Sequence, residues 1–538
     1  MLLIKTKTMK LTSILTALIF FCTFISYQSQ ITNEDRPKSW ELLGMKPISS
    51  INLPSFDFKS IQKEDQVSDK ILEIPYRFGY KFDVNYNLQN SGNWETLSNG
   101  DRIWRIRFTS KGALTMNFIL EDFFIPIGGK LFLYNNDKTD VLGAYTFTQN
   151  NTNRTLGTWI VKGDDIILEY FEPAAQEGKG TFTIKKITHG YRSGVDLNAS
   201  SDCNVDVNCS IGSDADPLKD FLKKSIGLVL VNGDAMCSGA LINNTSNNKK
   251  PYFLTANHCY SDPATWSFMF NWISTNTVCG TGEDSISNAD YHTISGATLK
   301  AKREIADFCL VEINSEIPEE WETVWSGWDR TGSVSPWVFG IHHPAGDIMK
   351  TCRDSDPIVL GNMWLINNWE VGYAEPGSSG SPLFNNNGKI IGQLCCGSTR
   401  CVENTYSTGS YSYGRLDVSW DGGGTPDTQL KNWLDPINSG ITSLDSYPSM
   451  NLNIEENFFS NQIQAYPNPS KGIFTIDLRK EKSELNFEIF SVSGILISKG
   501  KLEKRINKID LTRKSNGLYL LKIIKDNSVV KSIKLLKE

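Results

Sequence analysis

The chain contains, in this order, the segments TANHC (255–259), ADFCLVEI (306–313) and EPGSSGSPLF (375–384). They supply a histidine, an aspartate and a serine, which are His258, Asp307 and Ser379. A serine hydroxyl is a poor nucleophile at neutral pH. It needs a histidine base, and the histidine needs a carboxylate that fixes its tautomer. The three segments therefore predict nucleophilic acyl-transfer chemistry.

The order of these residues along the chain narrows the fold. The chymotrypsin-like double β-barrel has the order histidine, aspartate, serine, whereas subtilisins and α/β-hydrolases place the same residue types in other orders. Because His258, Asp307 and Ser379 follow the first order, they predict a mainly β fold with a chymotrypsin-like double β-barrel.

Each residue alone has a simpler interpretation. A Gly-Ser-Ser-Gly segment is most often a flexible loop, and a lone histidine is more often a core or surface residue than a base. Asp307 is harder to explain in this way, because it lies in an apolar, strand-like run. A carboxylate there must be paired or hydrogen-bonded. The ordered combination, with spacings of roughly 50 and 70 residues, favours the catalytic interpretation.

Glycines flank the candidate nucleophile on both sides, in the segment GSSGSP (377–382). Glycine permits backbone conformations that other residues avoid, so the segment can form a tight turn. In such a turn the backbone amides of Gly377 and Ser379 could converge on a developing oxyanion. We therefore expect these two amides to form the oxyanion hole.

The stretch from Cys203 to about Ser446 resembles a bacterial lysyl endopeptidase, a secreted trypsin-like serine protease. The matching strings, all in matching order, are CNVDVNC (203–209), CSGALINNT (237–245), KPYFLTANHC (250–259), SGWDR (326–330), IHHP (341–344), EPGSSGSP (375–382), IGQL (391–394), YGR (413–415) and NWLDP (432–436). This resemblance implies that His258, Asp307 and Ser379 are the catalytic triad.

Length and charge indicate several domains. A chain of 538 residues is too long for one core. The net charge of −6 gives no reason to expect nucleic acid as a partner. The charge is uneven, since residues 471–538 carry 16 Lys+Arg and 8 Asp+Glu, a balance of +8 that leaves −14 for the rest. Such a step suggests a separate module at the C-terminus.

The first 29 residues resemble an export signal. Lys5, Lys7 and Lys10 precede the mostly apolar run Leu11–Ile25, which is short for a membrane span. An N-terminal anchor is the alternative interpretation of 1–29. No later segment is long and apolar enough to cross a bilayer. With the signal and the C-terminal resemblance described below, we expect a secreted or cell-surface protein that is exported across the inner and outer membranes.

Three regions follow the signal. Residues 30–200 contain alternating stretches such as IWRIRF (103–108) and KLFLY (130–134), which predict strands. This β-rich region resembles the propeptide of the protease family, and an independent adhesive β-domain is the alternative. Residues 201–446 show short strands, frequent turns and one short predicted helix at 430–436, so they are expected to form the protease domain. The polar residues 447–463 are a predicted linker.

The last region, 464–538, predicts a small β-sandwich with turns at Gly472, Gly494 and Gly517. Its segments AYPNPSKGIFTIDL (465–478) and GLY (517–519) resemble the C-terminal sorting domain of the type IX secretion system. The resemblance implies the type IX machinery as a partner. A carbohydrate-binding or packing module is the alternative.

Cysteines are confined to one part of the exported chain, because ten of the 11 lie from Cys203 to Cys401. An oxidising compartment favours disulfides, and such a cluster marks the domain that they join. Resemblance to the lysyl endopeptidases implies the pairs Cys203–Cys401, Cys209–Cys279 and Cys237–Cys259.

Four cysteines fall outside that pattern, namely Cys309, Cys352, Cys395 and Cys396. The adjacent Cys395 and Cys396 do not suit a mutual bridge, and either could pair with Cys352. A zinc site is disfavoured, because the chain has five histidines and neither an HExxH nor a CxxC motif. We expect no metal and no cofactor.

Substrate specificity depends on the pocket for the side chain before the scissile bond, where a basic side chain needs a buried carboxylate. Trypsins carry that acid six residues before the serine, and this position is Tyr373 here. Lysyl endopeptidases carry it just before the Tyr-Gly-Arg string, where this chain has Ser410, Tyr411 and Ser412. The pocket histidine of that family is replaced by Cys395. Tyr373, Cys395 and Tyr411 are thus the candidate pocket residues, and they do not support a lysine preference. Glu403 is the nearest acid that could substitute.

The sequence as a whole predicts a secreted serine endopeptidase that hydrolyses peptide bonds in proteins through an acyl-enzyme and is a monomer when mature. A catalytically silent surface-binding protein on a protease scaffold is the alternative. The resemblance places the maturation cut between about Tyr191 and Ser201, an interval with Arg192, Leu197 and no lysine. We therefore expect cleavage by another protease or a preference other than strict lysine.

Overall fold

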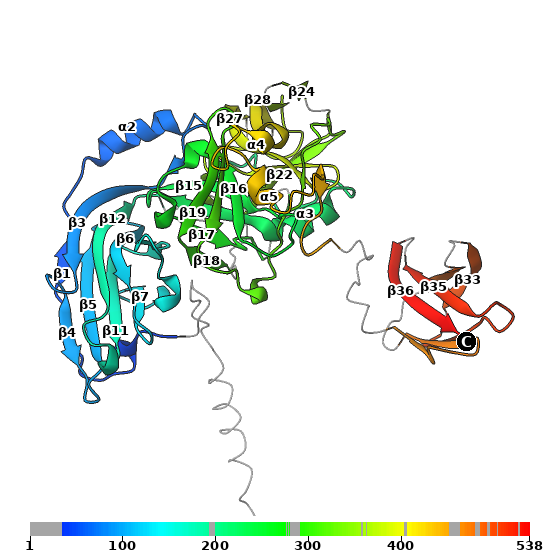
Figure 1. The fold of residues 1–538 in the computed structure, drawn as a ribbon, viewed down its shortest axis with the longest axis horizontal. Helices are drawn as coiled ribbons and strands as arrows, with labels where there is room; N and C mark the ends of the chain where they lie inside the picture. Colours follow the sequence, from blue (N-terminus) through cyan, green and yellow to red (C-terminus); the bar gives the residue numbers. More distant parts are fainter. Residues whose placement is uncertain are drawn as a thin grey trace, which may run out of the picture. The chain divides into compact units, whose positions relative to one another are not determined.

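The computed structural model describes residues 35–192, 200–275, 277, 279, 291–356, 359–361, 363–402, 406–450, 463–478, 485–491, 495–502, 504–525 and 528–538. The chain divides into two compact units, Met1–Pro448 and Ser449–Glu538 (Figure 1). Both units consist mainly of β-strands, which confirms the predicted fold class. The expected export signal at 1–29 lies outside the described residues, and no helix within the described ranges is long and apolar enough to cross a membrane.

Residues 35–192 fold into two β-sheets, which we call the N-terminal sandwich. In the first sheet the order is β1-β5-β11-β7-β8, with β4 beside β5. These strands are β1 (Ser50–Asn52), β4 (Asn93–Thr96), β5 (Arg102–Thr109), β7 (Lys130–Asn135), β8 (Val141–Tyr145) and β11 (Asp165–Glu172). The strands predicted at 103–108 and 130–134 are β5 and β7, so both predictions are confirmed.

The second sheet of the N-terminal sandwich has the order β10-β6-β12-β3, with β9 beside β6. Its strands are β3 (Gly79–Asn87), β6 (Thr115–Phe124), β9 (Leu156–Gly157), β10 (Val161–Lys162) and β12 (Thr181–Gly190). Apolar side chains of both sheets, such as Phe108 and Phe118, meet in one buried core. The alternating apolar pattern of the sequence therefore produces two layers that bury their facing sides.

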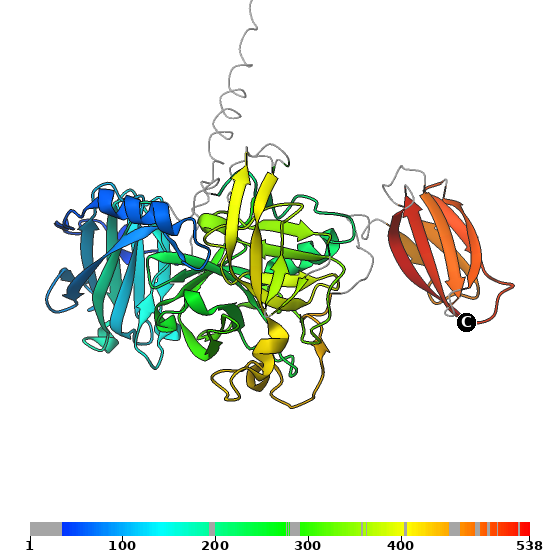
Figure 2. The same cartoon turned by 90° about the horizontal axis from the view of Figure 1, so that it is seen from above.

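Helix α2 (Phe58–Ser68), which the sequence pattern did not predict, carries the chain from the N-terminal sandwich towards the next region (Figures 1 and 2). The side chain of Asp57 caps its first turn. The buried carboxylate of Asp65 contacts Arg77 Nε at 2.8 Å and Arg192 Nη2 at 2.8 Å. These paired charges fix the helix beside the start of β3 and the end of β12, which lie at the same end of the second sheet.

Residues 200–448, which we call the central region, contain two larger sheets. The first has the order β18-β17-β14-β15-β16-β20-β19. Its strands are β14 (Ile226–Val231), β15 (Ala235–Leu241), β16 (Tyr252–Ala256), β17 (Ser267–Phe270), β18 (His292–Ser295), β19 (Ala297–Arg303) and β20 (Phe308–Ile313). Every residue of β14, β16 and β17 is buried, as expected for short, continuous apolar strands inside a barrel.

The second sheet of the central region has the order β13-β23-β22-β26-β27-β28-β25-β24, and β21 and β29 extend it beside β27. Its strands are β13 (Val205–Asp206), β21 (Trp328–Asp329), β22 (Val338–His342), β23 (Lys350–Asp354), β24 (Val359–Leu360), β25 (Trp364–Ile366), β26 (Pro382–Asn385), β27 (Ile390–Val402), β28 (Tyr406–Arg415) and β29 (Ser443–Leu444). Figure 2 shows the long β27–β28 hairpin, in yellow, extending past the rest of the sheet.

Short helices complete the central region, namely α3 (Asp216–Leu222), α4 (Leu416–Asp421) and α5 (Lys431–Leu434). The last of them confirms the helix predicted at 430–436. Each sheet has its own buried cluster, and a third cluster joins the two sheets through side chains such as Leu310 and Phe384. The two sheets therefore meet along a packed junction, as in the predicted chymotrypsin-like arrangement.

Three disulfides occur in the central region, and they are the pairs that the resemblance implied: Cys203–Cys401, Cys209–Cys279 and Cys237–Cys259. Cys309, Cys352, Cys395 and Cys396 are free. The structure therefore does not contain the pairing of Cys352 with Cys395 or Cys396 that the sequence left open.

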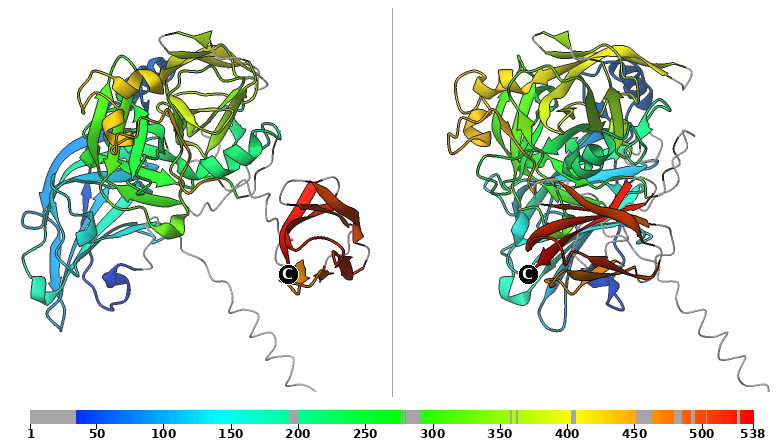
Figure 3. Two further views of the ribbon diagram at one scale, coloured as in Figure 1. Left: turned by 45° about the vertical axis from the view of Figure 1, so that its right-hand side comes forward. Right: turned by 90° about the vertical axis from the view of Figure 1, so that its right-hand side faces the viewer.

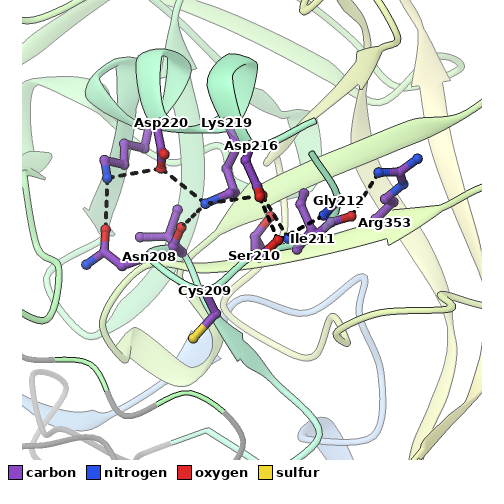
Figure 4. Close-up of polar contacts among 12 residues, drawn as sticks. Asn208, Cys209, Ser210, Ile211, Gly212, Asp216, Lys219, Asp220 and Arg353 are labelled. Atoms are coloured by element: carbon purple, nitrogen blue, oxygen red, sulfur yellow. Dashed lines mark hydrogen bonds and ion pairs between the residues drawn. The ribbon is translucent and has the colours of Figure 1, made fainter. Parts of the chain in front are cut away.

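Polar contacts hold the loop that carries Cys209 against helix α3 (Figure 4). Lys219 of this helix is 1% exposed, and its ammonium donates to the Val207 carbonyl at 2.6 Å and to Asp220 at 3.1 Å. Asp216 accepts the backbone N–H of Ile211 at 2.8 Å. Because the buried ammonium has hydrogen-bond partners, its burial does not destabilise the fold. It instead fixes the loop just before Cys209.

The N-terminal sandwich and the first sheet of the central region share one hydrophobic core. Phe78, Phe118 and Trp159 from the sandwich pack in the same cluster as Leu230 and Met236 of the central region. This continuity explains why residues up to Pro448 form a single compact unit.

The C-terminal unit is a small β-sandwich of two sheets, as predicted, and Figure 3 shows its two layers. One sheet contains β30 (Gln464–Tyr466), β31 (Ile473–Asp477) and β34 (Ile506–Asp510), and the other contains β32 (Leu485–Ser491), β33 (Leu496–Leu502), β35 (Gly517–Lys525) and β36 (Ser528–Lys537). Gly472 lies in a turn at φ 118°. Gly494 and most of the predicted linker, 451–462, lie outside the described residues.

Candidate active site

His258 and Asp307 are brought together by the pairing of two neighbouring strands. Ala256 of β16 lies opposite Phe308 of β20, so the residues just beyond these two positions are adjacent. His258 Nδ1 lies 2.8 Å from Asp307 Oδ2, and the backbone N–H of His258 donates to Oδ1 at 2.9 Å. The buried carboxylate is thus hydrogen-bonded, as its apolar surroundings require.

The backbone of Asp307 adopts a left-handed conformation with φ 48°. Such conformations are uncommon for residues other than glycine, and they concentrate at functional sites. The carbonyl of Asp307 accepts the N–H of Asn257 at 2.8 Å, while its own N–H donates to Glu304 at 2.9 Å. These bonds hold the aspartate in a geometry that directs its carboxylate to His258.

Ser379 lies in the loop before β26, and Ser238 of β15 holds this loop from both sides. The backbone N–H of Ser238 donates to the Ser379 carbonyl at 2.8 Å, and its hydroxyl donates to the Gly377 carbonyl at 2.8 Å. The same hydroxyl accepts the N–H of His343 at 2.9 Å. One serine of the first sheet therefore fixes the position of the candidate nucleophile, which comes from the second sheet.

Two glycines of this loop have no room for a side chain. Gly377 has φ 99°, and an added Cβ would lie 2.6 Å from the backbone nitrogen of Ala345. Gly380 has φ 82°, and its Cβ would lie 2.6 Å from the nitrogen of Ala256. Glycine is therefore required at both positions for the tight loop that the sequence predicted.

The backbone amides of Gly377 and Ser379 donate to no other described residue. They thus lack a described partner, as the amides of the predicted oxyanion hole would before a substrate binds.

The hydroxyl of Ser379 does not bond to His258 in this structure. It donates to the carbonyl oxygen of Leu72 at 2.8 Å, a residue 307 positions earlier in the chain. Within the described part of the chain, Nε2 of His258 is buried and lacks a hydrogen-bond partner. The structure therefore brings the histidine and the aspartate into contact and places a segment of the N-terminal region against the serine.

The three predicted pocket residues, Tyr373, Cys395 and Tyr411, are all buried. Tyr411 belongs to the apolar cluster of the second sheet that also contains Leu72. Glu403, the acid considered as a substitute, lies outside the described residues. Among the described residues, Asp354, Asp356 and Glu370 form the one group with metal-ligand spacing, within 4.8 Å, and none of them belongs to the predicted site.

Sequence reasoning missed two buried histidines that support the serine loop. His342 Nδ1 lies 2.8 Å from the hydroxyl of Ser378, and His343 Nδ1 lies 3.0 Å from the carbonyl oxygen of Asp347. Burial lowers the pKa of His342 to about 3 and the pKa of His343 to about 4, so both imidazoles are neutral at pH 7. Both occur in the matching string IHHP, which was a signal for the family but not for this role.

Two acidic side chains hold the chain just before the first disulfide. Asp347, which is fully buried, accepts the hydroxyl of Ser200 at 2.6 Å, and Glu375 accepts the N–H of Ser201 at 2.8 Å. Burial raises the pKa of both carboxyls. The end of the interval expected for maturation is therefore fixed beside the serine loop.

Comparisons with known proteins agree with the division of the chain. Residues 197–414 match the family model described as lysyl endopeptidase, C-terminal domain, and residues 464–538 match the secretion system C-terminal sorting domain. A lysyl endopeptidase of Pseudomonas aeruginosa is 26% identical over 257 residues, which cover 44% of this chain and 54% of the relative. The chain thus spans about half the length of the curated relative that it matches.

Similar solved structures include an inactive form of Rv3671c from M. tuberculosis and the human heparin binding protein. Each is 12% identical to the chain, with TM-scores of 0.24 and 0.26. They cover 37% and 36% of this chain, and 86% and 87% of their own chains. The sequence matches support a serine protease, and the sorting domain indicates an exported protein. Residues 197–414 resemble the C-terminal domain of lysyl endopeptidase, and residues 464–538 resemble a type IX secretion sorting domain.

Proposed function

We propose that the chain is a secreted serine endopeptidase, made as a latent precursor, that hydrolyses peptide bonds through His258, Asp307 and Ser379. The observation that carries this proposal is the double contact of His258 with Asp307. Ser379 lies nearby, in a tight loop that requires glycine at 377 and 380. This is the arrangement that activates a serine for acyl transfer.

In the proposed reaction, Ser379 Oγ attacks the carbonyl carbon of the substrate, and His258 Nε2 accepts the hydroxyl proton. The amides of Gly377 and Ser379 stabilise the oxyanion. His258 then donates the proton to the leaving amine, which gives the acyl-enzyme, and a water molecule hydrolyses that ester by the same steps in reverse order. Asp307 keeps Nδ1–H directed towards itself, so that Nε2 faces the serine and the imidazolium is stabilised.

The missing bond between Ser379 and His258 is consistent with a latent precursor. The carbonyl of Leu72 takes the serine hydroxyl while the N-terminal sandwich is attached. When this segment leaves, the hydroxyl loses its partner and His258 Nε2 is the basic atom that replaces it. The proposal thus assigns 1–29 to the signal, 30–200 to the propeptide, 201–446 to the protease and 464–538 to the sorting domain, with 447–463 as linker.

Proteins are the proposed substrates, the type IX machinery is the proposed partner of 464–538, and the mature enzyme is proposed to be a monomer. A catalytically silent binding protein is the competing function. The experiment that separates them is fluorophosphonate labelling of the secreted, processed protein, beside a Ser379→Ala sample. We expect labelling of the wild type alone. Lack of labelling of the wild type would favour the silent protein.

A further inference from the structure

Leu72 lies directly against the candidate nucleophile. Its carbonyl oxygen accepts the hydroxyl of Ser379 at 2.8 Å, so its carbonyl group lies at the candidate nucleophile. In this chemistry the attacked carbonyl belongs to the residue whose side chain enters the specificity pocket. The surroundings of the Leu72 side chain are therefore informative about this pocket.

The chain that follows Leu72 binds the protease region as an added strand. Strand β2 (Tyr76–Arg77) pairs antiparallel with β15, where Tyr76 lies opposite Met236. The N–H of Phe78 donates to the carbonyl of Asp234 at 2.9 Å. Strand β15 lies inside its sheet, but β16 pairs only with its end, at Ala240 and Leu241, so β2 adds to the part that β16 does not reach. Strand addition of this kind is a common way to bind an extended peptide. The segment thus lies along the site in one direction, from Leu72 at the serine to Phe78 on β15.

The side chain of Leu72 is 1% exposed and packs in an apolar cluster of the second sheet. The other members of this cluster are Val338, Cys352, Trp364, Ile366, Trp369, Ala374, Leu383, Ile391, Leu394, Tyr411 and Tyr413. Among the described residues, Leu72 is the one member that does not come from 338–413, and none of the others carries a charge. The described cluster that receives the Leu72 side chain beside Ser379 is therefore uncharged.

A lysine side chain would fit this pocket poorly. Its ammonium would lose its hydration without gaining a carboxylate partner, which is costly in a buried site. A leucine gains about 25 cal/mol for each Å² of apolar surface that it buries. Tyr373 and residues 410–412, where related proteases carry the acid, contain none.

We propose that the mature enzyme cleaves after leucine or an aliphatic residue of similar size, and not after lysine. The proposal rests on the serine endopeptidase function and names its substrate class. It also assigns to Leu72 the role of the side chain that fills the pocket in the precursor.

We do not expect the precursor to cut itself after Leu72, because the geometry of this bound segment does not suit attack by Ser379. The N–H of Ile74 donates to the carbonyl of Ile71 at 3.2 Å, which closes a turn around Leu72. Neither Gly377 nor Ser379 donates its amide to the Leu72 carbonyl, so the oxyanion that attack would create lacks its donors. The segment therefore occupies the site without the geometry of a substrate.

The first experiment uses processed, secreted enzyme whose active sites are counted by fluorophosphonate labelling. Fluorogenic peptides that differ only before the cleaved bond carry leucine, alanine or lysine there. We expect kcat/KM for the leucine peptide to exceed that for the lysine peptide by at least about 100-fold. Labelled enzyme that cleaves the lysine peptide as well as the leucine peptide would overturn the specificity, whereas unlabelled protein would instead overturn the proposed function.

The second experiment measures the rate of fluorophosphonate labelling of the full-length precursor. Leu72→Lys should label at least about tenfold faster than wild type, because its ammonium leaves the apolar pocket. Leu72→Ala, a smaller change, should label at an intermediate rate. Ile74→Lys is the matched control, since this nearby side chain is 39% exposed, and its rate should equal that of the wild type. Equal rates for Leu72→Lys, Leu72→Ala and wild type would show that Leu72 does not fill the pocket.

Discussion

His258 is bound to Asp307 at two points, through Nδ1 at 2.8 Å and through its backbone N–H at 2.9 Å. The first contact sets the tautomer and the orientation of the ring, and the second fixes the backbone from which the ring projects. Because both oxygens of the carboxylate are used, rotation of the Asp307 side chain is opposed by two hydrogen bonds.

We predict that Ser379→Ala or His258→Ala lowers peptide hydrolysis by several orders of magnitude while the fold is preserved. Asp307→Asn should lower kcat by roughly 10⁴-fold, since an amide holds the imidazole in the wrong tautomer. Turnover on a peptide substrate and circular dichroism of each purified variant check these expectations. Near-normal hydrolysis by Ser379→Ala would rule out the serine mechanism.

A second prediction concerns Ser238, which the sequence did not single out. Ser238→Ala leaves the Gly377 carbonyl without its donor and the His343 N–H without its acceptor, both of them buried. We expect a loss of about 1–3 kcal/mol in the free energy of unfolding and a lower kcat. Urea unfolding and steady-state kinetics measure the two effects. Ser333→Ala, at an exposed position, is the control, and equal behaviour of both variants would contradict the prediction.

A third prediction is acid sensitivity from the two histidines. Their pKa values are about 3 and about 4 in the fold and near 6.5 when unfolded, so the unfolded chain binds more protons below pH 6.5. Their contribution to stability is complete above pH 6.5 and is lost as the pH falls towards 4 and 3. From pH 7 to pH 5 the two together should cost about 4 kcal/mol.

The measurement compares urea unfolding of the wild type and of a His342→Gln, His343→Gln variant at both pH values. Burial raises the pKa values of Asp347 and Glu375, so the contribution of these carboxyls to stability increases as the pH falls. This contribution is present in both proteins. The difference between the two proteins therefore isolates the histidines. A wild type that loses no more stability than the variant on acidification would refute the expected burial effect.

A fourth prediction concerns export. Deletion of 465–538 should leave catalysis by the processed enzyme intact, because the C-terminal unit is separate from the unit that holds His258, Asp307 and Ser379. The deletion should abolish release beyond the outer membrane, since residues 464–538 match a secretion system C-terminal sorting domain. Immunoblots of cell fractions and of the medium provide the measurement. Normal release of the truncated protein would show that the segment is not an address.

Local patterns in the sequence predicted the parts of the fold that depend on neighbouring residues. The apolar strands β5 and β7, the tight glycine loop and the short helix α5 each follow from a few consecutive residues. The position of Asp307 could be anticipated as well, because a carboxylate within an apolar run requires a partner.

The contacts of Leu72 could not be predicted in the same way. The bond between its carbonyl and Ser379 joins residues 307 positions apart, and a leucine in a turn has no pattern that names its partner. The same holds for Asp65 of helix α2. Its buried carboxylate is stabilised by Arg77 and Arg192, which contact it only in the folded chain. Such long-range contacts depend on the whole topology and leave no local signal.

The core that the N-terminal sandwich shares with the central region has a consequence for the proposed maturation. A cut between residues 192 and 200 breaks one covalent link, but Phe78, Leu230 and Met236 remain packed in the same cluster. If the chain is processed as proposed, the two pieces would then form a noncovalent complex, and its dissociation, not the cut, would expose Ser379. Once the link is gone, rebinding depends on concentration. The proposed enzyme would therefore stay inactive at high concentration and become active on dilution or after proteolysis of the N-terminal sandwich.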